Sequence, residues 1–208
     1  MSDAMRRESP LIAHLTAGLP VRLAVQGLSL QERAFHGHVN LRCDPDDAST
    51  AARLEAALGC ALPRTPNTFT LAPDGGKVLW LGPDEFLAIT PDSPDGREAA
   101  LAAALRQAAG QAFVAVNELG PGQTVIELSG PRARETLAKG CPLDLHPRVF
   151  GPGSCAQSRL ARALVTIAQV DHAGDGPCFE VIVRRSFADY LWRWLADASE
   201  FAVVPRYA

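Results

Sequence analysis

The chain has 208 residues, a formal net charge of −3 at pH 7, 47% hydrophobic residues and 21% charged residues. That length suits one large domain or two small lobes, with a core that needs no disulfide or metal for stability. The small negative charge gives no electrostatic reason to expect nucleic acid or an acidic membrane as a partner, and no apolar run approaches the ~18 residues that cross a bilayer.

Residues 1–33 are predicted to form an N-terminal arm, because residues 1–20 show no sustained hydrophobic period. The apolar stretch from Leu11 to Leu19 is interrupted by polar residues and glycine, so it is a poor core for a signal peptide. We therefore expect a cytoplasmic protein. The five cysteines agree with this expectation, since an odd number without a C-x-x-C pair indicates reduced, mostly buried thiols.

A first lobe is predicted over residues 34–119. Its first helix is expected to have Asp44 as N-cap and Pro45 as first helical residue, and to end at Gly59. A second, alanine-rich helix is predicted over residues 97–109. Segments rich in strand-favouring residues are expected to form strands at 35–41, 67–71, 77–81, 85–90 and 112–116.

A second lobe is predicted over residues 120–208, with the same order of elements. One helix is expected to begin at Pro131 with Gly130 as N-cap, and the last helix has Ser186 as its predicted N-cap. Strands are expected at 124–128, at 158–170 as one long strand or a bent pair, at 179–183 and at 201–204. Each half reads β-α-β-β-α-β, which predicts an α+β fold of two fused ferredoxin-like lobes from an old duplication.

Several long motifs in the second half carry a family resemblance. They are Leu128-Ser129-Gly130-Pro131-x-Ala133-Arg134-Glu135, Ala138-Lys139-Gly140-Cys141-Pro142-Leu143-Asp144-Leu145-His146-Pro147-Arg148, Cys155-Ala156-Gln157 and Arg185-Ser186-Phe187-Ala188-Asp189-Tyr190-Leu191-Trp192-x-Trp194-Leu195. The block from Gly120 to Phe201 closely resembles the gamma subunit of heterotetrameric sarcosine oxidase. The first half is less similar to that family, and residues 1 to about 33 match it poorly.

This resemblance implies a fold similar to the folate-binding lobe of aminomethyltransferases and a non-catalytic role. The assembled enzyme of that family oxidatively demethylates sarcosine to glycine and transfers the one-carbon unit to tetrahydrofolate. The complex is expected to carry FAD, FMN and NAD, none of them bound by this chain, and the implied partners are its alpha, beta and delta subunits. Consistent with that, the sequence has no G-x-G-x-x-G motif after a strand and no P-loop.

Two other functions would each require a feature that the sequence lacks. A stand-alone folate-dependent aminomethyltransferase would need a catalytic carboxylate near the pteridine, and the corresponding zone offers only Asp74, which better suits an Asp74-Gly75-Gly76 hairpin turn. A folate-linked assembly factor would need a reactive cysteine motif, which the sequence does not contain. We therefore predict no catalytic and no cofactor-binding residue in this chain.

Two residue pairs could suggest chemistry. His36 and His38 would put two imidazoles on one face of a strand, but two ligands are too few for a closed zinc site, so we predict no metal site. Cys141 and His146 could suggest a thiol nucleophile. However, a helix C-terminus disfavours the thiolate, and Cys60 occupies the equivalent place in the first half without a histidine, so a packing role is favoured.

The predicted partner interface lies in the second lobe. Two prolines hold the segment Pro142–Pro147 in a fixed shape, which suits either a docking loop or an internal loop that covers the sheet. Trp192 and Tyr190 flank the apolar stripe of the last helix and either complete the core or face a partner. The candidate interface residues are Trp192, Tyr190, Leu143, Leu145, His146 and Arg148.

The second half also carries more arginines than nearby acids. They are Arg132, Arg134, Arg148, Arg159, Arg162, Arg184 and Arg185. Recognition of a ligand carboxylate or phosphate would require two or three of them to converge. Pairing with acidic residues of a partner protein is the favoured interpretation.

Overall fold

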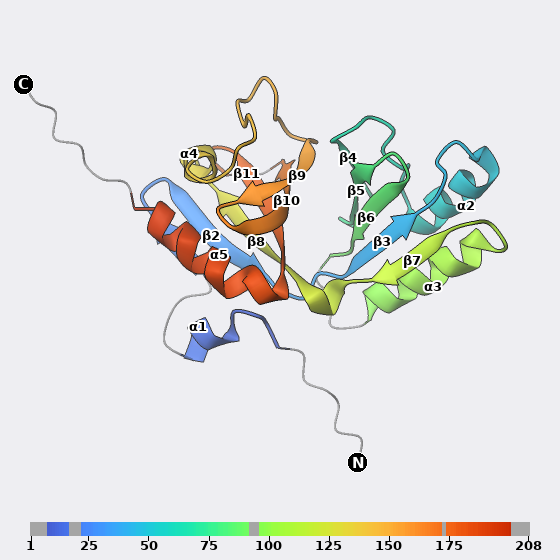
Figure 1. The fold of residues 1–208 in the computed structure, drawn as a ribbon, viewed down its shortest axis with the longest axis horizontal. Helices are drawn as coiled ribbons and strands as arrows, with labels where there is room; N and C mark the ends of the chain where they lie inside the picture. Colours follow the sequence, from blue (N-terminus) through green and yellow to red (C-terminus); the bar gives the residue numbers. More distant parts are fainter. Residues whose placement is uncertain (1–7, 17–21, 92–95, 172–173, 201–208) are drawn as a thin grey trace, which may run out of the picture.

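The computed structural model describes residues 8–16, 22–91, 96–171 and 174–200. Within these ranges the chain forms two lobes, each an antiparallel sheet with helices on its outer side (Figure 1). The two sheets face each other across the middle of the molecule. The α+β fold class predicted from the sequence is therefore confirmed.

The first lobe has a five-stranded sheet in the order β4-β5-β6-β3-β7. Its strands are β3 (His38–Arg42), β4 (Phe69–Leu71), β5 (Lys77–Gly82), β6 (Glu85–Ile89) and β7 (Ala115–Glu118). The helices α2 (Ala48–Leu58) and α3 (Arg97–Ala109) cover its outer face, where Phe86 meets Leu54 and Leu105. The order β5-β6-β3-β7 is that of a β-α-β-β-α-β unit, with β4 added at one edge.

The second lobe has a six-stranded sheet in the order β1-β2-β8-β11-β10-β9. Its strands are β1 (Arg22–Val25), β2 (Leu28–Arg33), β8 (Gln123–Ser129), β9 (Cys155–Leu160), β10 (Ala163–Val170) and β11 (Cys178–Arg184). Its helices are α1 (Ile12–Thr16), the 3₁₀ helix η1 (Gly120–Gly122), α4 (Ala133–Ala138) and α5 (Arg185–Ala198). Leu191 and Leu195 of α5 are fully buried against the outer face of this sheet.

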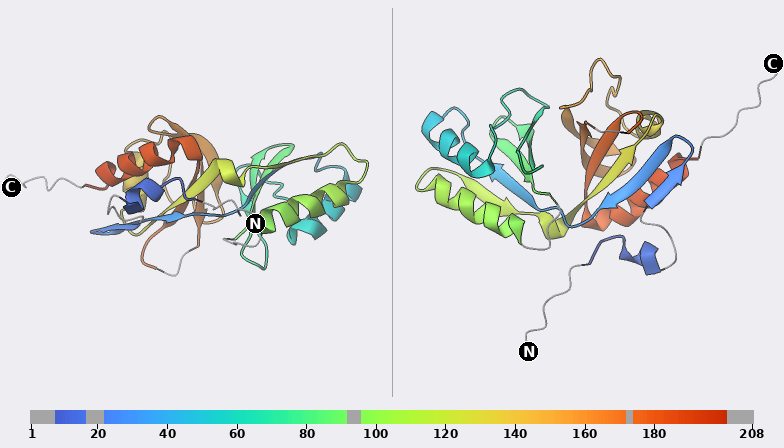
Figure 2. Two further views of the ribbon diagram at one scale, coloured as in Figure 1. Left: turned by 90° about the horizontal axis from the view of Figure 1, so that it is seen from below. Right: turned by 180° about the vertical axis from the view of Figure 1, so that it is seen from behind.

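The N-terminal hairpin β1–β2 is part of the second sheet. Residues 22–33, which the sequence analysis assigned to an arm, pair as two antiparallel strands, and β2 continues the sheet by pairing with β8, with Leu30 opposite Leu128. Figure 2 shows this hairpin beside β8. Its place is the one that the fourth strand of a β-α-β-β-α-β unit would take. The predicted strand at 201–204 lies outside the described residues.

The predicted start of α2 is wrong. Asp47, rather than Asp44, is the N-cap, and its carboxylate accepts hydrogen bonds from the N–H groups of Ser49 and Thr50 at 3.1 and 3.2 Å. Pro45 therefore precedes the helix. Both aspartates have the chemistry of an N-cap, so the sequence alone did not distinguish them. The predicted end at Gly59 is confirmed, since this glycine takes the left-handed conformation with φ of 73°.

The predicted starts of α4 and α5 are also wrong. Gly130 and Pro131 precede α4 instead of opening it, and Gly130, with φ of +116°, lies so close to the first hairpin that a Cβ atom would be 2.6 Å from the carbonyl oxygen of Gly27. Ser186 is not the N-cap of α5. The strand β11 continues directly into the helix, and Arg184 occupies the cap position without a side-chain cap.

The two sheets pack on each other through an apolar layer. It contains Leu79, Leu87 and Ile89 from the first sheet and Val125, Cys155, Ala168 and Ile182 from the second. Beside this layer, Lys77 Nζ donates to both carboxylate oxygens of Glu180 at 2.6 and 2.5 Å. Only 9% of the Lys77 side chain and 13% of the Glu180 side chain are exposed. This nearly buried ion pair joins the two lobes.

We expect Lys77→Met to destabilise the chain by about 3–5 kcal/mol, because it leaves the Glu180 carboxylate nearly buried without its cation. Urea unfolding of the full chain measures this loss, and a K77M/E180L double variant should recover most of it. The matched control is Arg42→Met, since the Arg42–Asp84 pair is 2.8 Å long but its two side chains are 50% and 56% exposed, and its loss should cost at most about 1 kcal/mol. Equal losses in K77M and the double variant would contradict this account of the pair.

His38 is a buried polar residue of β3. It has 0% exposure, and both of its ring nitrogens lack a hydrogen-bond partner among the described residues. Burial lowers the pKa of His38 to about 3, with a smaller contribution from the nearby His36. The imidazole therefore stays neutral in the folded chain at pH values where the unfolded chain binds a proton.

This difference predicts a pH-dependent stability. The unfolded state binds more protons than the folded state between the ordinary histidine pKa of 6.5 and the folded value of about 3, so stability is present above this window and is lost as the pH falls through it. The free energy of unfolding should fall by about 1.4 kcal/mol more per pH unit between about pH 6 and about pH 4.5 than in His38→Leu. Urea unfolding at several pH values measures this, with the exposed His146→Asn as control. Parallel pH profiles for the wild type and His38→Leu would contradict it.

The structure also bears on the cysteines and on the length of the helices. Four of the five cysteines are buried and Cys60 is half-buried, which confirms the prediction of mostly buried thiols, and all five are free. In the part of the chain that the structure describes, every helix is too short or too polar to cross a membrane.

Candidate partner-docking surface

The loop between α4 and β9 contains most of the predicted interface residues. It leaves α4 at Lys139, and Pro142 prevents the helix from continuing. At Gly140 a Cβ atom would lie 2.6 Å from the ring of Trp194, so only glycine lets the loop pack this closely on α5. The start of the loop is thus fixed against the last helix.

Arg134 of α4 fixes the rest of this loop. Its Nη1 atom donates to the carbonyl oxygens of Leu145 and Phe150, the latter at 3.0 Å, and its Nη2 atom donates to Oε1 of the buried Gln169 at 2.9 Å. The guanidinium also lies 5.0 Å from the ring centroid of Phe179, within the range of a cation–π contact. Burial lowers the pKa of Arg134, yet a guanidinium keeps its charge. One cation therefore ties two points of the loop to the sheet.

The loop crest, defined here as residues 146–149, faces solvent between these two points. Leu145 and Phe150 are 4% and 6% exposed and form its anchors, whereas Val149 is 63% exposed. Within the crest, the N–H of Arg148 donates to Nδ1 of His146 at 3.2 Å. The segment therefore covers the sheet through its anchors and leaves its crest exposed, and its role as a docking loop stays a prediction.

Of the two predicted interface residues on α5, one is buried and the other is exposed. Trp192 is 4% exposed and belongs to the core of the second lobe, 6.3 Å from the ring of His14. His14 in turn lies 2.5 Å from the carboxylate of Asp189, so the N-terminal segment covers Trp192. Tyr190 is 36% exposed. Of the six predicted residues, His146, Arg148 and Tyr190 are directly accessible, Leu143 is half-buried, and Leu145 and Trp192 support the surface from within.

The two members of each pair that could have suggested chemistry lie in different surroundings. His36 precedes β3 and its Nδ1 atom lies 2.9 Å from the carbonyl oxygen of Thr90, whereas His38 is enclosed within β3. Cys141 is 8% exposed with its sulfur 3.9 Å from the Ser158 hydroxyl, and His146 stands on the loop crest. Across the ranges described, no three histidine, cysteine or acidic residues gather closely enough to hold a metal ion.

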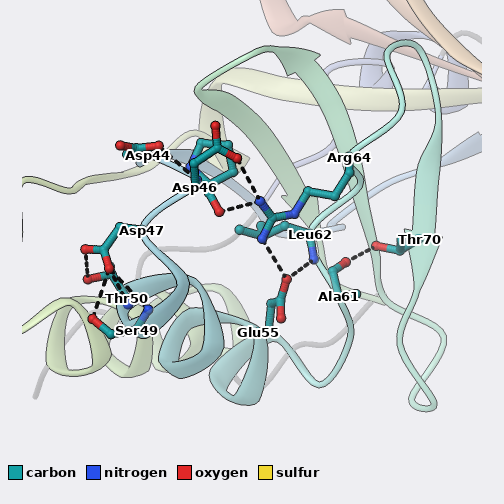
Figure 3. Close-up of polar contacts among 11 residues, drawn as sticks. Asp44, Asp46, Asp47, Ser49, Thr50, Glu55, Ala61, Leu62, Arg64 and Thr70 are labelled. Atoms are coloured by element: carbon teal, nitrogen blue, oxygen red, sulfur yellow. Dashed lines mark hydrogen bonds and ion pairs between the residues drawn. The ribbon is translucent and has the colours of Figure 1, made fainter.

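A further surface feature, at the start of α2, was missed by the sequence analysis. Asp44, Asp46 and Asp47 gather there, and Arg64 lies 3.7 Å from the Asp46 carboxylate (Figure 3). Hydrogen bonds from Thr50 and Ser49 lower the pKa of Asp47 to about 2. These acids border an open groove of about 800 Å³. Phe113 lies on the rim of this groove and is fully exposed. This phenylalanine is the feature of the sequence that could have indicated the groove, since a large apolar residue in a polar loop marks surface that a partner can cover.

We expect Arg134→Leu to loosen the loop crest. The change leaves the carbonyl groups of Leu145 and Phe150 without their charged donor, which should cost about 1.5–3 kcal/mol of stability. Amide hydrogen exchange of residues 143–150 and urea unfolding measure the effect, with the exposed Arg148→Leu as control. If exchange in this segment is equally slow in both variants, Arg134 does not hold the loop.

The sequence is similar to known proteins along nearly its whole length. The family model described as sarcosine oxidase, gamma subunit family, matches residues 42–201. The sarcosine oxidase subunit gamma of Arthrobacter sp is 39% identical over 202 residues, which cover 97% of this chain and 94% of that protein. The corresponding subunit of Corynebacterium sp. (strain P-1) is 38% identical over 200 residues, with coverages of 96% and 93%.

The similarity extends to solved structures. A chain of the heterotetrameric sarcosine oxidase from Corynebacterium sp. U-96 superposes with a TM-score of 0.80 at 33% identity, covering 95% of this chain and 99% of that one. The glycine cleavage system aminomethyltransferase T of Bartonella henselae superposes with a TM-score of 0.66 at 16% identity, covering 89% of this chain but 56% of that enzyme. The second likeness concerns the fold alone.

Proposed function

This chain belongs to the sarcosine oxidase gamma subunit family, and from that premise we propose that it is a non-catalytic subunit of a heterotetrameric sarcosine oxidase. The observation that carries this proposal is the match to a gamma subunit and to a chain of a heterotetrameric sarcosine oxidase. Each match covers nearly the whole of this chain and nearly the whole of the relative. In this role the chain works through protein–protein contact and supports assembly of the complex.

The relatives favour this role over that of a stand-alone folate-dependent aminomethyltransferase. The chain covers little more than half of aminomethyltransferase T, whereas it covers more than 90% of the gamma subunits. Asp74, the candidate carboxylate for such an enzyme, accepts a hydrogen bond from the N–H of Gly76 at 2.9 Å. That contact supports the turn that joins β4 to β5 and leaves Asp74 with a structural role.

The partners in this proposal are the alpha, beta and delta subunits, in the cytoplasm. The complex would carry FAD, FMN and NAD and pass the one-carbon unit to tetrahydrofolate, with these groups held by the other chains. Sarcosine would be demethylated to glycine away from this subunit. The chain's own contribution is then a rigid contact surface, and the loop crest with Tyr190 of α5 is its proposed centre.

Co-expression tests the subunit role most simply. When this chain carries an affinity tag and is produced with the three other subunits encoded by its own organism, we expect all four chains to co-purify in equal amounts. The chain produced alone should show no heat of binding with tetrahydrofolate or FAD in calorimetry. Recovery of the tagged chain without the others, or tetrahydrofolate binding with turnover, would favour the stand-alone enzyme instead.

The loop crest provides a sharper test. We expect Val149→Asp to weaken binding to the other subunits by at least about tenfold, or about 1.4 kcal/mol, because it places a charge in a contact that buries an apolar side chain. Leu71→Asp is the matched control, since Leu71 is 60% exposed and lies on the other lobe. Dissociation constants from biolayer interferometry compare the two variants. Equal effects would exclude the crest as a specific contact.

A further inference from the structure

Several arginines of the second lobe are exposed and pair with no acid of the described residues. Among the described residues six arginines form ion pairs within 4.0 Å, namely Arg33, Arg42, Arg64, Arg97, Arg106 and Arg193. Arg159, Arg162 and Arg184 are exposed and belong to none of these pairs. In a chain with a net charge of −3, such a group of unpaired cations is a local reversal of sign.

The strand register brings two of these arginines together around an exposed leucine, and Arg162 lies in the turn between β9 and β10. Arg159 of β9 lies opposite Leu164 of β10. Val165 lies opposite Val183 of β11, and one further step of this register places Leu164 opposite Arg184. Cross-strand partners share a face of the sheet, and two strand spacings separate the outer arginines by about 10 Å at the backbone. Leu164 is 64% exposed between them.

This face continues the contact between the two sheets. Ala168 and Ile182, an even number of residues from Leu164 and Arg184, lie in the apolar layer between the lobes, so the alternation of side chains puts all four on the same face. The first lobe covers this face of the second sheet as far as Gln157, whose Nε2 atom donates to the carbonyl oxygen of Leu81 at 3.0 Å. Beyond that contact Arg159, Leu164 and Arg184 are left exposed by the residues that the structure describes.

We propose that Arg159, Arg162, Leu164 and Arg184, called here the arginine strip, dock an acidic segment of a partner subunit. The occupant that fits is a protein segment with an apolar side chain between two carboxylates. The apolar side chain would cover Leu164, and each carboxylate would accept paired hydrogen bonds from an arginine fork. This inference rests on the proposed subunit role and adds a second contact, separate from the loop crest.

Charge reversal tests the strip in the complete complex. We expect R159E/R184E to weaken binding to the other three subunits by at least about tenfold, and to reduce the salt dependence of the dissociation constant, because screened charge pairs are lost. R97E/R106E changes the net charge equally on the first lobe and should bind almost as the wild type does. Wild-type affinity in R159E/R184E would overturn the strip while leaving the subunit role intact. Failure of the wild type to bind would overturn both.

A zero-length cross-link identifies the occupant. R159K/R184K keeps both charges and gives each position an amine, which a carbodiimide joins to a carboxylate in direct contact, with the carbodiimide released as its urea. Mass spectrometry of the assembled complex should find peptides that link position 159 or 184 to an aspartate or glutamate of another subunit. Cross-links confined to this chain, or none in a complex that has assembled, would show that no acidic segment occupies the strip.

Discussion

The apolar layer between the two sheets is the contact on which the rest of the molecule depends. Each sheet has helices on its outer face, and its inner face packs against the other sheet. Lys77 and Glu180 add a nearly buried ion pair to this layer, and a cation there is tolerated only because its carboxylate is in direct contact. Because the lobes use their inner faces on each other, the surfaces left for partners are loops, rims and uncovered ends of strands.

Two such surfaces lie on the second lobe and differ in how they are built. The loop crest is held by Arg134, which draws the carbonyl groups on either side of it toward the sheet. The arginine strip is fixed by the register of three hydrogen-bonded strands and needs no clamp of its own. The backbone of both is held by contacts within the chain, so a partner that docked there would have little backbone left to order. That property suits a subunit whose contribution is contact area.

Local sequence signals predicted much of the fold, but they could not predict contacts between residues far apart in the sequence. The helix Arg97–Ala109 was predicted to the residue, because alanine-rich sequence and a following glycine define it locally. The pairing of β2 with β8 joins segments almost a hundred residues apart and leaves no trace in local periodicity. Trp192 has the pattern of a surface aromatic, but His14 and its segment cover it. The role of Arg134 depends on carbonyl groups, which no side-chain pattern reveals.

Hydrogen exchange in the free chain and in the assembled complex tests most directly the claim that this protein acts through outward contact area. We expect assembly to slow exchange at the loop crest and around Arg162, and to leave β5 and β6 unchanged. Tetrahydrofolate or FAD added to the free chain should alter neither region. Unchanged exchange at both surfaces in an assembled complex, or protection of the free chain by either small molecule, would contradict the account.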